Sequence, residues 1–535
     1  MKAFLMYRDR DFDPQQILSV DSMDHRANRD DVEMRFRSLL PWNEEALTQD
    51  LGLEILFNAM SLGDTFLYAV ARAAITNSVT DPDTIIYRQR VFQDCVKYES
   101  VVMEMYQIAI EAIQGERKNY WSSFGRYPSG TLHRGLEILR LFVGILKRLR
   151  TIADNNAERF ESEGFTTLLA MLRRELSDDY FAKIEDHLER LQFDEGVLIS
   201  AALGRGNKGY NYLLRKQAED KRIWIARRLF SRKLPGFTFQ LHPRDESGAR
   251  ALSVLRDQGV NLVANALAQS TDHILSFFHM LRTELAFYVA CLNLQRQLTA
   301  LGEPTCLPNP TPIGERNLVF HELYDVCLAL SAKQKVIGND LSADGEDIIV
   351  ITGANTGGKS TFMRSVGLAR LMMQAGMFVP AESFTANICQ GLFTHFKREE
   401  DVTMESGKLD EELARMSSII DHLTENSLVL FNESFAATNE REGSEIATQI
   451  VRALLEKGIE VIFVTHLYKF ARGLLDNKIG RAVFLRAERK NDGTRTFKIT
   501  EGEPLQTSYG KDLYDAIFRE GERKVQSRQC SAVAD

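Results

Sequence analysis

The chain has 535 residues, of which 44% are hydrophobic and 26% charged, a composition typical of a globular protein and not of a disordered or fibrous one. At roughly 150 residues per domain, this length predicts three or four domains. Sixty-six basic and 74 acidic residues give a net charge of −8, so any contact with nucleic acid must come from a local basic patch.

The sequence gives no sign of a membrane-spanning or secreted protein. Its uninterrupted apolar runs, such as the one at 348–351, fall far short of the roughly 20 residues that cross a bilayer. The apolar stretch near the N-terminus is too short for a signal peptide. The six cysteines form no Cys-Xaa-Xaa-Cys pair. We therefore expect a cytoplasmic protein with no zinc ribbon, no disulfide framework and no membrane partner.

Helical patterns dominate residues 51–303, after an N-terminal segment at 1–50. The longest, at 260–301, contains no Gly or Pro and would form a helix about 63 Å long. Its apolar face comprises Ile274, Phe277, Phe278, Leu281, Leu285, Tyr288 and Leu292. Shorter patterns comprise Leu136, Leu139, Val143 and Leu146, and then Ile184, Leu188 and Leu191. A compact bundle would explain any one pattern, but their combined length favours a helical core with levers and arms.

Prolines mark a change of pattern. Prolines 304, 308, 310 and 312 lie within nine residues and predict a junction at 304–320. Beyond it, β-branched apolar runs at 347–352, 428–431 and 459–465 predict strands, and a helix between the last two ends at Gly458. Strand, helix and strand at this spacing predict a parallel α/β unit. The predicted fold is therefore an α-helical region followed by an α/β domain at 321–518, with a polar tail at 519–535.

The clearest motif is a phosphate-binding loop that fits the pattern G-x-x-x-x-G-K-[ST]. It comprises Gly353, Ala354, Asn355, Thr356, Gly357, Gly358, Lys359, Ser360 and Thr361. Its glycines let backbone N–H groups surround phosphates, Lys359 supplies positive charge, and the Ser360 hydroxyl binds Mg²⁺. A chance match is disfavoured because a predicted strand enters the loop and a predicted helix leaves it. The motif predicts binding of ATP with Mg²⁺.

A second motif lies at the end of the strand at 427–433. Glu433 would act as general base for the attacking water, although a solvated strand-end carboxylate is the alternative. Asn432 stands where an Asp is expected, and its amide oxygen can hold Mg²⁺ through water. The missing charge could weaken metal binding by a few kcal/mol, on the order of one charge at an effective dielectric near 20. We therefore expect an ATPase with slow turnover.

His466 ends the next strand, 33 residues after Glu433. A histidine beside the phosphates can sense the terminal phosphate or position water, whereas alone it would more often be structural. Its place after the two preceding motifs favours the catalytic interpretation.

The segments from 339 to 381, with the strand ends at Asn432-Glu433 and Thr465-His466 and the run at 501–510, resemble the P-loop, ABC-type ATPase domain of the MutS family of DNA mismatch repair proteins. Residues 81–90 and the long helix resemble that family's helical core and lever. The resemblance implies that Asn339 contacts adenine, with Tyr509 as a further stacking candidate. It also implies a homodimer in which a serine loop of one protomer, here Ser406 and Gly407, completes the other's site. A charged surface turn is the alternative for that segment.

Three departures from the family pattern affect the prediction. Ala354 and Thr356 replace the usual Pro and Met, and 435–438 replaces Gly-Arg-Gly-Thr with Phe-Ala-Ala-Thr. Only about fifty residues precede the core-like segment. We therefore expect a shortened member that lacks the N-terminal mismatch-reading and connector domains and does not read mismatches directly.

One stretch is a candidate for DNA contact. Residues 205–233 contain ten basic and two acidic residues interleaved with aromatic ones, and such a stretch can neutralise phosphates without reading bases. The candidates are Arg205, Lys208, Arg215, Lys216, Lys221, Arg222, Arg227 and Arg228. Solvated helix faces or ion pairs between domains are the alternative.

These observations predict an ATP-hydrolysing, MutS-like protein that forms a nucleotide-driven dimeric clamp on double-stranded DNA. The alternative is a nucleotide-gated scaffold with weak or no hydrolysis that acts on a protein or RNA partner. A small-molecule P-loop kinase is disfavoured because no acceptor or lid segment follows the loop.

Overall fold

The computed structural model describes residues 1–12, 40–120, 127–193, 196–215, 238–354, 356–398, 407–489 and 495–504. The chain divides into two compact units, residues 1–4 with 98–285, and residues 5–97 with 286–535. This division differs from the predicted one, in which residues 51–303 form a single helical region. The difference arises because residues 51–97 pack against the α/β part of the chain.

The first unit is built mainly of helices. They are α7 (Glu99–Tyr120), α8 (Pro128–Asn156), α9 (Glu163–Glu175), α10 (Asp178–Arg190) and α12 (Glu246–Ala300) as far as Leu285. The side chains of Ser162 and Ser177 cap α9 and α10 by accepting backbone N–H groups of their first turns. The predicted apolar face of α8 is confirmed, since all four of its residues are buried.

A hairpin interrupts the helices of this unit. Strands β1 (Ile199–Leu203) and β2 (Gly209–Leu214) pair antiparallel and are joined by the short 3-10 helix η1 (Arg205–Asn207). The hairpin exposes Leu203 and Tyr210 to solvent.

Helix α12 is 55 residues long, about 82 Å at 1.5 Å per residue. It starts at Glu246, earlier than the predicted 260, and so includes Gly248 and Gly259. A glycine inside a helix lowers helix propensity but does not by itself end the helix. Its predicted apolar face is buried throughout. By length and hydropathy this helix could cross a membrane, but 78% of its most apolar window is buried inside the protein.

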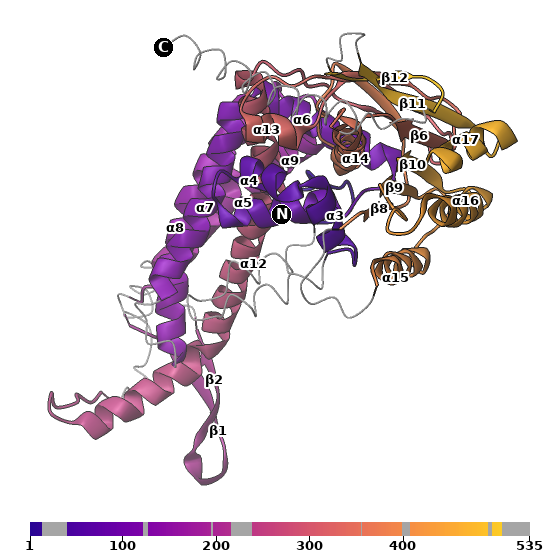
Figure 1. Ribbon diagram of the computed structural model, residues 1–535. Helices are drawn as coiled ribbons and strands as arrows, with labels where there is room; N and C mark the ends of the chain where they lie inside the picture. The colour runs from indigo at the N-terminus through magenta and orange to yellow at the C-terminus, as the bar shows by residue number, and fades with distance from the viewer. Residues whose placement is uncertain are drawn as a thin grey trace, which may run out of the picture. The chain divides into compact units, whose positions relative to one another are not determined.

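The second unit contains a six-stranded sheet in the order β12-β11-β6-β10-β9-β8 (Figure 1). The strands are β6 (Ile348–Thr352), β8 (Leu392–Phe396), β9 (Leu428–Asn432), β10 (Glu460–Val464), β11 (Ala482–Arg489) and β12 (Arg495–Glu501). All neighbours pair parallel except β12, which pairs antiparallel with β11 at one edge. The three predicted strands and their parallel arrangement are confirmed.

Helices cover both faces of this sheet. On one face, α14 (Lys359–Ala375) contacts β9 and β10 and is itself covered by α3 (Glu44–Leu51), α5 (Thr65–Thr76) and α6 (Pro82–Lys97). On the other face, α15 (Lys408–Ile420), α16 (Glu440–Glu456) and α17 (Tyr468–Asn477) bury a core around Phe431, Phe463 and Phe470. Helix α16 is the helix predicted between the last two of the predicted strands, and it is followed by Gly458 at φ 71°. The sheet is therefore an α/β layer covered on both sides.

A smaller sheet lies beside it, in the order β3-β7-β4-β5. Its strands are β3 (Asn309–Thr311), β4 (Leu318–Leu323), β5 (Asn339–Ser342) and β7 (Ser383–Asn387), and α4 (Leu53–Ser61) packs on α13 (Val326–Ala332) nearby. The proline-rich segment at 304–320 is thus part of a sheet and not only a junction. Pro310 is buried in β3, an edge strand, where a residue without an N–H group is tolerated.

Arg88 links the segment at 5–12 to the C-terminal end of α14. Leu5 and Met6 are buried, and Arg88 of α6 donates from Nε to the Met6 carbonyl at 2.9 Å and from Nη1 to the Ala375 carbonyl at 3.0 Å. Tyr288 donates its hydroxyl to the Leu5 carbonyl at 2.6 Å. Residues 5–12 are therefore part of the second unit, and Arg88 fixes the helix that starts at the phosphate loop.

Candidate functional site

The predicted catalytic residues meet at the carboxyl ends of three neighbouring parallel strands. Strand β6 leads into the phosphate loop, β9 ends at Asn432, and β10 ends two residues before His466. In the register of the sheet, Val464 lies beside both Asn432 and Ile351. Because parallel strands end at the same edge, motifs 80 and 33 residues apart along the chain come together.

The phosphate loop has the backbone conformation that its glycines permit. Gly353 and Gly358 have φ values of +115° and +89°, and Thr356 is also left-handed at φ 57°. A Cβ atom on Gly357 would lie 2.7 Å from the Cβ atom of Ala487, so the loop packs closely against β11. Asn355 lies outside the described residues. The described part of the loop forms a glycine-lined turn in front of the first turn of α14.

Lys359 is buried, with 4% of its surface exposed, and its ammonium group is held inside the loop. It donates to the carbonyl oxygens of Gly353 at 3.0 Å and Ala354 at 2.9 Å. Burial lowers the pKa of Lys359 to about 8, and the nearby carboxylate of Glu433 partly opposes this shift. The loop therefore folds over the Lys359 side chain.

The predicted metal residues contact each other directly. The Ser360 hydroxyl donates to Oδ1 of Asn432 at 2.8 Å. These are two oxygen groups of the kind that Mg²⁺ takes in nucleotide sites, directly or through water. The described residues contain no group of three or more His, Cys, Asp or Glu side chains that could hold a metal by themselves.

Glu433 and His466 form the third element of the site. His466 Nε2 lies 3.1 Å from Glu433 Oε1 and 3.4 Å from Lys359 Nζ. The hydrogen bond with His466 is the main cause that keeps the pKa of Glu433 below its usual value, against the opposing effect of burial. Glu433 has φ 54°, and Phe435, which replaces a family glycine, has φ 60°. The turn after β9 therefore projects an ionised carboxylate from a left-handed backbone position.

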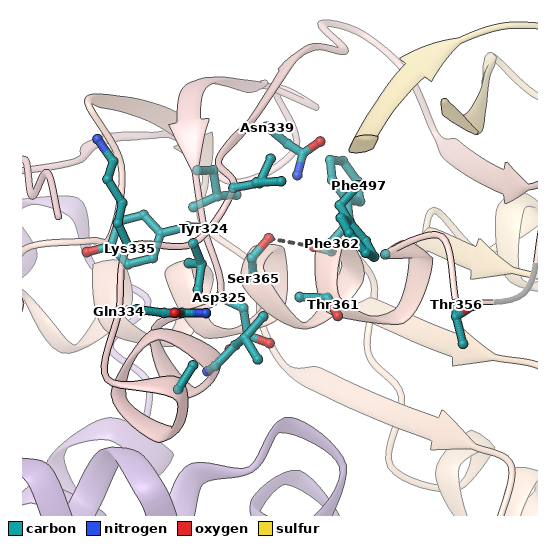
Figure 2. A pocket seen from close by; sticks show the side chains of 16 residues that line it. Tyr324, Asp325, Gln334, Lys335, Asn339, Thr356, Thr361, Phe362, Ser365 and Phe497 are labelled. Atoms are coloured by element: carbon teal, nitrogen blue, oxygen red, sulfur yellow. Dashed lines mark hydrogen bonds between the residues drawn. The ribbon is translucent and has the colours of Figure 1, made fainter. Parts of the chain in front are cut away.

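A pocket of about 420 Å³ opens on the other side of the phosphate loop (Figure 2). Asn339, Thr356, Gly358 and Thr361 line it, as does Phe497 of β12. Oδ1 of Asn339 accepts the Ile499 N–H at 2.7 Å, and its amide nitrogen is directed toward the pocket. The size of the pocket and its contact with the loop suit the base and sugar of a nucleotide.

Phe497 is the site residue that the sequence interpretation missed. It has a left-handed φ of 59° and is 47% exposed, and its backbone lies against Gly358. The alternation of residues in 495–501 could have indicated a strand, but not that this strand folds back over the phosphate loop. The stacking candidate named from the sequence, Tyr509, lies outside the described residues.

The remaining candidates are placed only in part. Ser406 lies outside the described residues, and Gly407 is the N-cap of α15. Of the basic candidates, Arg205, Lys208 and Arg215 lie on or next to the β1–β2 hairpin and are exposed. The other five, Lys216, Lys221, Arg222, Arg227 and Arg228, lie outside the described residues.

Comparison with known proteins finds relatives of both the helical and the α/β part of the chain. A family model described as the MutS2 N-terminal domain matches residues 80–301, and one described as MutS domain V matches residues 349–518. The DNA mismatch repair protein MutS of Lactobacillus gasseri is 30% identical over 226 residues, which are 39% of this chain and 26% of that protein. The DNA mismatch repair protein Msh3 of Homo sapiens is 30% identical over 225 residues, 41% of this chain and 19% of that protein.

A third relative, the DNA mismatch repair protein MutS of Thermotoga sp. (strain RQ2), is 38% identical over 134 residues, 25% of this chain and 17% of that protein. The chain thus matches about a quarter or less of the length of these relatives. The two family models together take in most of the chain, and the second includes the phosphate loop, Glu433 and His466. From these matches and from the site that they enclose, the chain belongs to the MutS family.

Proposed function

We propose that this protein binds and hydrolyses ATP with Mg²⁺ and uses ATP binding to drive a dimeric clamp on double-stranded DNA, without reading mismatched bases. The observation that carries the proposal is the meeting of Lys359, Asn432 and Glu433 at one edge of the sheet. Each of these residues matches a role that nucleotide hydrolysis requires: phosphate charge, metal support and general base.

The residues present fit a nucleotide and its metal. Backbone N–H groups of the glycine-lined loop and the first turn of α14 suit phosphates, and the carbonyl oxygens that now hold the Lys359 ammonium are weaker partners than phosphate oxygens would be. Ser360 would hold Mg²⁺ directly and Asn432 would hold it through water. When bound, the metal supplies charge neutralisation on the phosphates. Asn339 would donate to the base and Phe497 would stack on it.

Hydrolysis is assigned to Glu433. A general base must be ionised, and the lowered pKa of Glu433 keeps it so throughout the neutral range. His466 contacts both Glu433 and Lys359, and we assign it the positioning of water or of the terminal phosphate. Two protomers would share the nucleotides, with Ser406 of one protomer completing the site of the other.

Lys359→Ala tests the nucleotide site. We expect ATP binding, measured by calorimetry, to be lost while circular dichroism and the melting temperature stay close to wild type. Lys457→Ala, which removes an exposed lysine at the end of α16, is the matched control and should bind normally. ATP binding by Lys359→Ala at the wild-type affinity would refute the site.

Glu433→Gln tests hydrolysis and dimerisation together. This variant should bind ATP, release no phosphate and sediment as a dimer in the presence of ATP. The wild-type protein should return to its ATP-free sedimentation behaviour as ATP is consumed. Wild-type phosphate release by this variant would assign the general base to another residue.

The DNA part of the proposal rests on the β1–β2 hairpin. Arg205 and Lys208 lie at its turn, and Arg215 follows β2, where its Nε donates to the Ser200 hydroxyl at 2.7 Å. Cations on an exposed hairpin can contact phosphates and leave base edges unread. This arrangement supports binding that does not depend on sequence or mismatches.

Replacement of these three residues by alanine should weaken binding to homoduplex and mismatched DNA equally. The slope of log affinity against log salt should fall by about 0.9 for each DNA phosphate that the variant no longer neutralises. The control replaces Arg140, Arg174 and Arg190, exposed arginines on the helices of the same unit. An unchanged salt slope in the hairpin variant, or a weakening specific to mismatched DNA, would contradict the proposal.

The second candidate function is a nucleotide-gated scaffold that binds ATP, hydrolyses it little or not at all, and acts on a protein or RNA partner. The observation that favours it is the side chain of Asn432. Its neutral amide accepts a hydrogen bond from the Ser360 hydroxyl, so no carboxylate stands at position 432, next to the expected metal ligand Ser360. Steady-state phosphate release with and without duplex DNA separates the two functions. Stimulation by DNA supports the clamp, and ATP binding without turnover supports the scaffold.

A further inference from the structure

A buried cluster of polar side chains lies directly behind the turn that contains Glu433. It consists of His395 on β8, Glu412 on α15, and Ser434 and Phe435 in the turn itself. His395 and Ser434 have no exposed surface and Glu412 has 7%. Neither the phosphate loop nor the nucleotide pocket includes any of them.

The hydrogen bonds of this cluster hold the turn from two neighbouring elements. From α15, Oε2 of Glu412 accepts the backbone N–H of Phe435 at 2.7 Å. From β8, two atoms of His395 contact the Ser434 hydroxyl: the ring nitrogen Nδ1 at 2.7 Å and the backbone carbonyl oxygen at 2.5 Å. The hydroxyl has one proton and donates it to one of these two atoms. His395 Nε2 donates to the Glu412 carbonyl at 3.0 Å and so links the two elements. The ring of Phe435 also stacks on that of His395, with centroids 5.2 Å apart.

The turn needs such support because its backbone is unfavourable. Glu433 and Phe435 both have left-handed φ angles, 54° and 60°, and neither is a glycine. Residues in this conformation persist only where their surroundings fix them. On the other side of Ser434, the N–H of Glu433 donates to the Val464 carbonyl at 2.9 Å. The backbone on both sides of the Glu433 carboxylate is therefore held by specific hydrogen bonds.

We propose that Glu412 and His395 are positioning residues that fix the turn at 433–435 and so aim the Glu433 carboxylate at the phosphate side of the site. The proposal rests on the proposed hydrolysis of ATP by Glu433. Because Glu412 lies on α15, a displacement of that helix would also displace the turn and with it the Glu433 carboxylate. The orientation of the general base therefore depends on the position of a helix that contributes no side chain to the nucleotide pocket.

The sharpest test compares Glu412→Ala with Glu412→Gln. The alanine variant loses the acceptor for the Phe435 N–H group, whereas the glutamine variant retains an amide oxygen of nearly the same reach. We expect kcat of the alanine variant to fall by a factor on the order of 100, the effect of misplacing a catalytic group by about 1 Å. The dissociation constant for ATP should change less than about twofold, because the phosphate loop is untouched. The glutamine variant should restore most of kcat.

A second readout is independent of turnover. Hydrogen exchange at the Phe435 amide should be slow in wild type and in Glu412→Gln, and fast in Glu412→Ala. Ser434→Ala removes the link to His395 at little cost in volume, so it should also lower kcat without changing ATP affinity, and it keeps the test available if Glu412→Ala folds poorly. Glu411→Ala, the adjacent and more exposed carboxylate of α15, is the matched control.

The outcomes distinguish the inference from the function on which it rests. If wild type releases no phosphate, the proposed hydrolysis fails and this inference fails with it. If wild type is active and Glu412→Ala and Ser434→Ala retain its kcat, the inference alone is overturned. It is also overturned if kcat and ATP binding fall together, or if the glutamine variant is as inactive as the alanine variant, because either result would indicate a general loss of structure.

Discussion

His466 lies between the two charged groups of the site, with Nε2 3.1 Å from the Glu433 carboxylate and 3.4 Å from the Lys359 ammonium. The two strands that carry Glu433 and His466 are neighbours in the sheet, so this arrangement follows from the register of β9 and β10. The hydrogen bond is the largest influence on the pKa of Glu433 and lowers it, while burial acts in the opposite direction. Removal of His466 should therefore leave burial as the dominant effect.

We predict that His466→Ala moves the acidic limb of the ATPase pH profile to higher pH. A general base works only when deprotonated, and the pKa of Glu433 should rise once its hydrogen-bond donor is removed. His466→Asn retains a donor and should keep the limb closer to wild type. The measurement is kcat against pH for the three proteins at saturating ATP and Mg²⁺. If all three acidic limbs coincide, His466 does not control the ionisation of Glu433.

The local motifs of the site could be predicted from sequence, because each lies at the end of a short buried strand. The phosphate loop, Asn432, Glu433 and His466 were placed in this way, and parallel pairing brought them together. Contacts that depend on distant segments could not be predicted. Phe497 reaches the loop only because β12 turns back on β11, and Arg88 is paired with Met6, 82 residues earlier in the chain. The division between the two compact units at Lys97 is likewise not visible in the sequence, because a helical period does not tell which neighbour a helix packs on.

Phe497→Ala should weaken nucleotide binding without loss of the fold. The side chain is 47% exposed and lines the pocket beside Asn339, so its removal costs little core packing. Stacking of a base on an aromatic ring is worth about 1–3 kcal/mol, which corresponds to a rise of roughly 5- to 150-fold in the dissociation constants of ATP and ADP. Phe497→Trp should restore affinity. Tripolyphosphate, which has no base, is the control ligand, and an equal loss of its affinity would place Phe497 on the phosphates instead.

Binding of ATP near pH 8 should be accompanied by proton uptake at Lys359. Burial lowers the pKa of this lysine to about 8, so near that pH about half of the free protein carries a neutral amine there. Bound phosphate favours the charged form and should draw in about half a proton for each site. Calorimetry in buffers of different ionisation enthalpy measures this uptake directly. It should be close to zero at pH 6.5, and equal uptake at both pH values would contradict the assignment.

The last prediction concerns Asn432, which separates the clamp from the scaffold. Its Oδ1 accepts the Ser360 hydroxyl at 2.8 Å, and an aspartate oxygen could accept the same hydrogen bond without movement of either strand. Asn432→Asp therefore adds one negative charge beside the metal position with little change in shape. At an effective dielectric near 20 and a distance of about 4 Å, one pair of unit charges is worth about 4 kcal/mol, an upper bound for this partly exposed site.

If the native site hydrolyses ATP but holds Mg²⁺ weakly, Asn432→Asp should lower the Mg²⁺ concentration that gives half-maximal activity. Turnover should then rise more at limiting than at saturating Mg²⁺, because saturation already fills the wild-type site. Asn432→Ala removes the side-chain oxygen and should move the same midpoint to higher Mg²⁺. This variant is the control that links the midpoint to the side chain at position 432. The decisive experiment is phosphate release against Mg²⁺ for the three proteins at fixed ATP. An unchanged Mg²⁺ midpoint in both variants would show that position 432 does not support the metal. A fall in turnover of the aspartate variant at every Mg²⁺ concentration would favour the scaffold, because it would indicate a site adapted to a neutral amide.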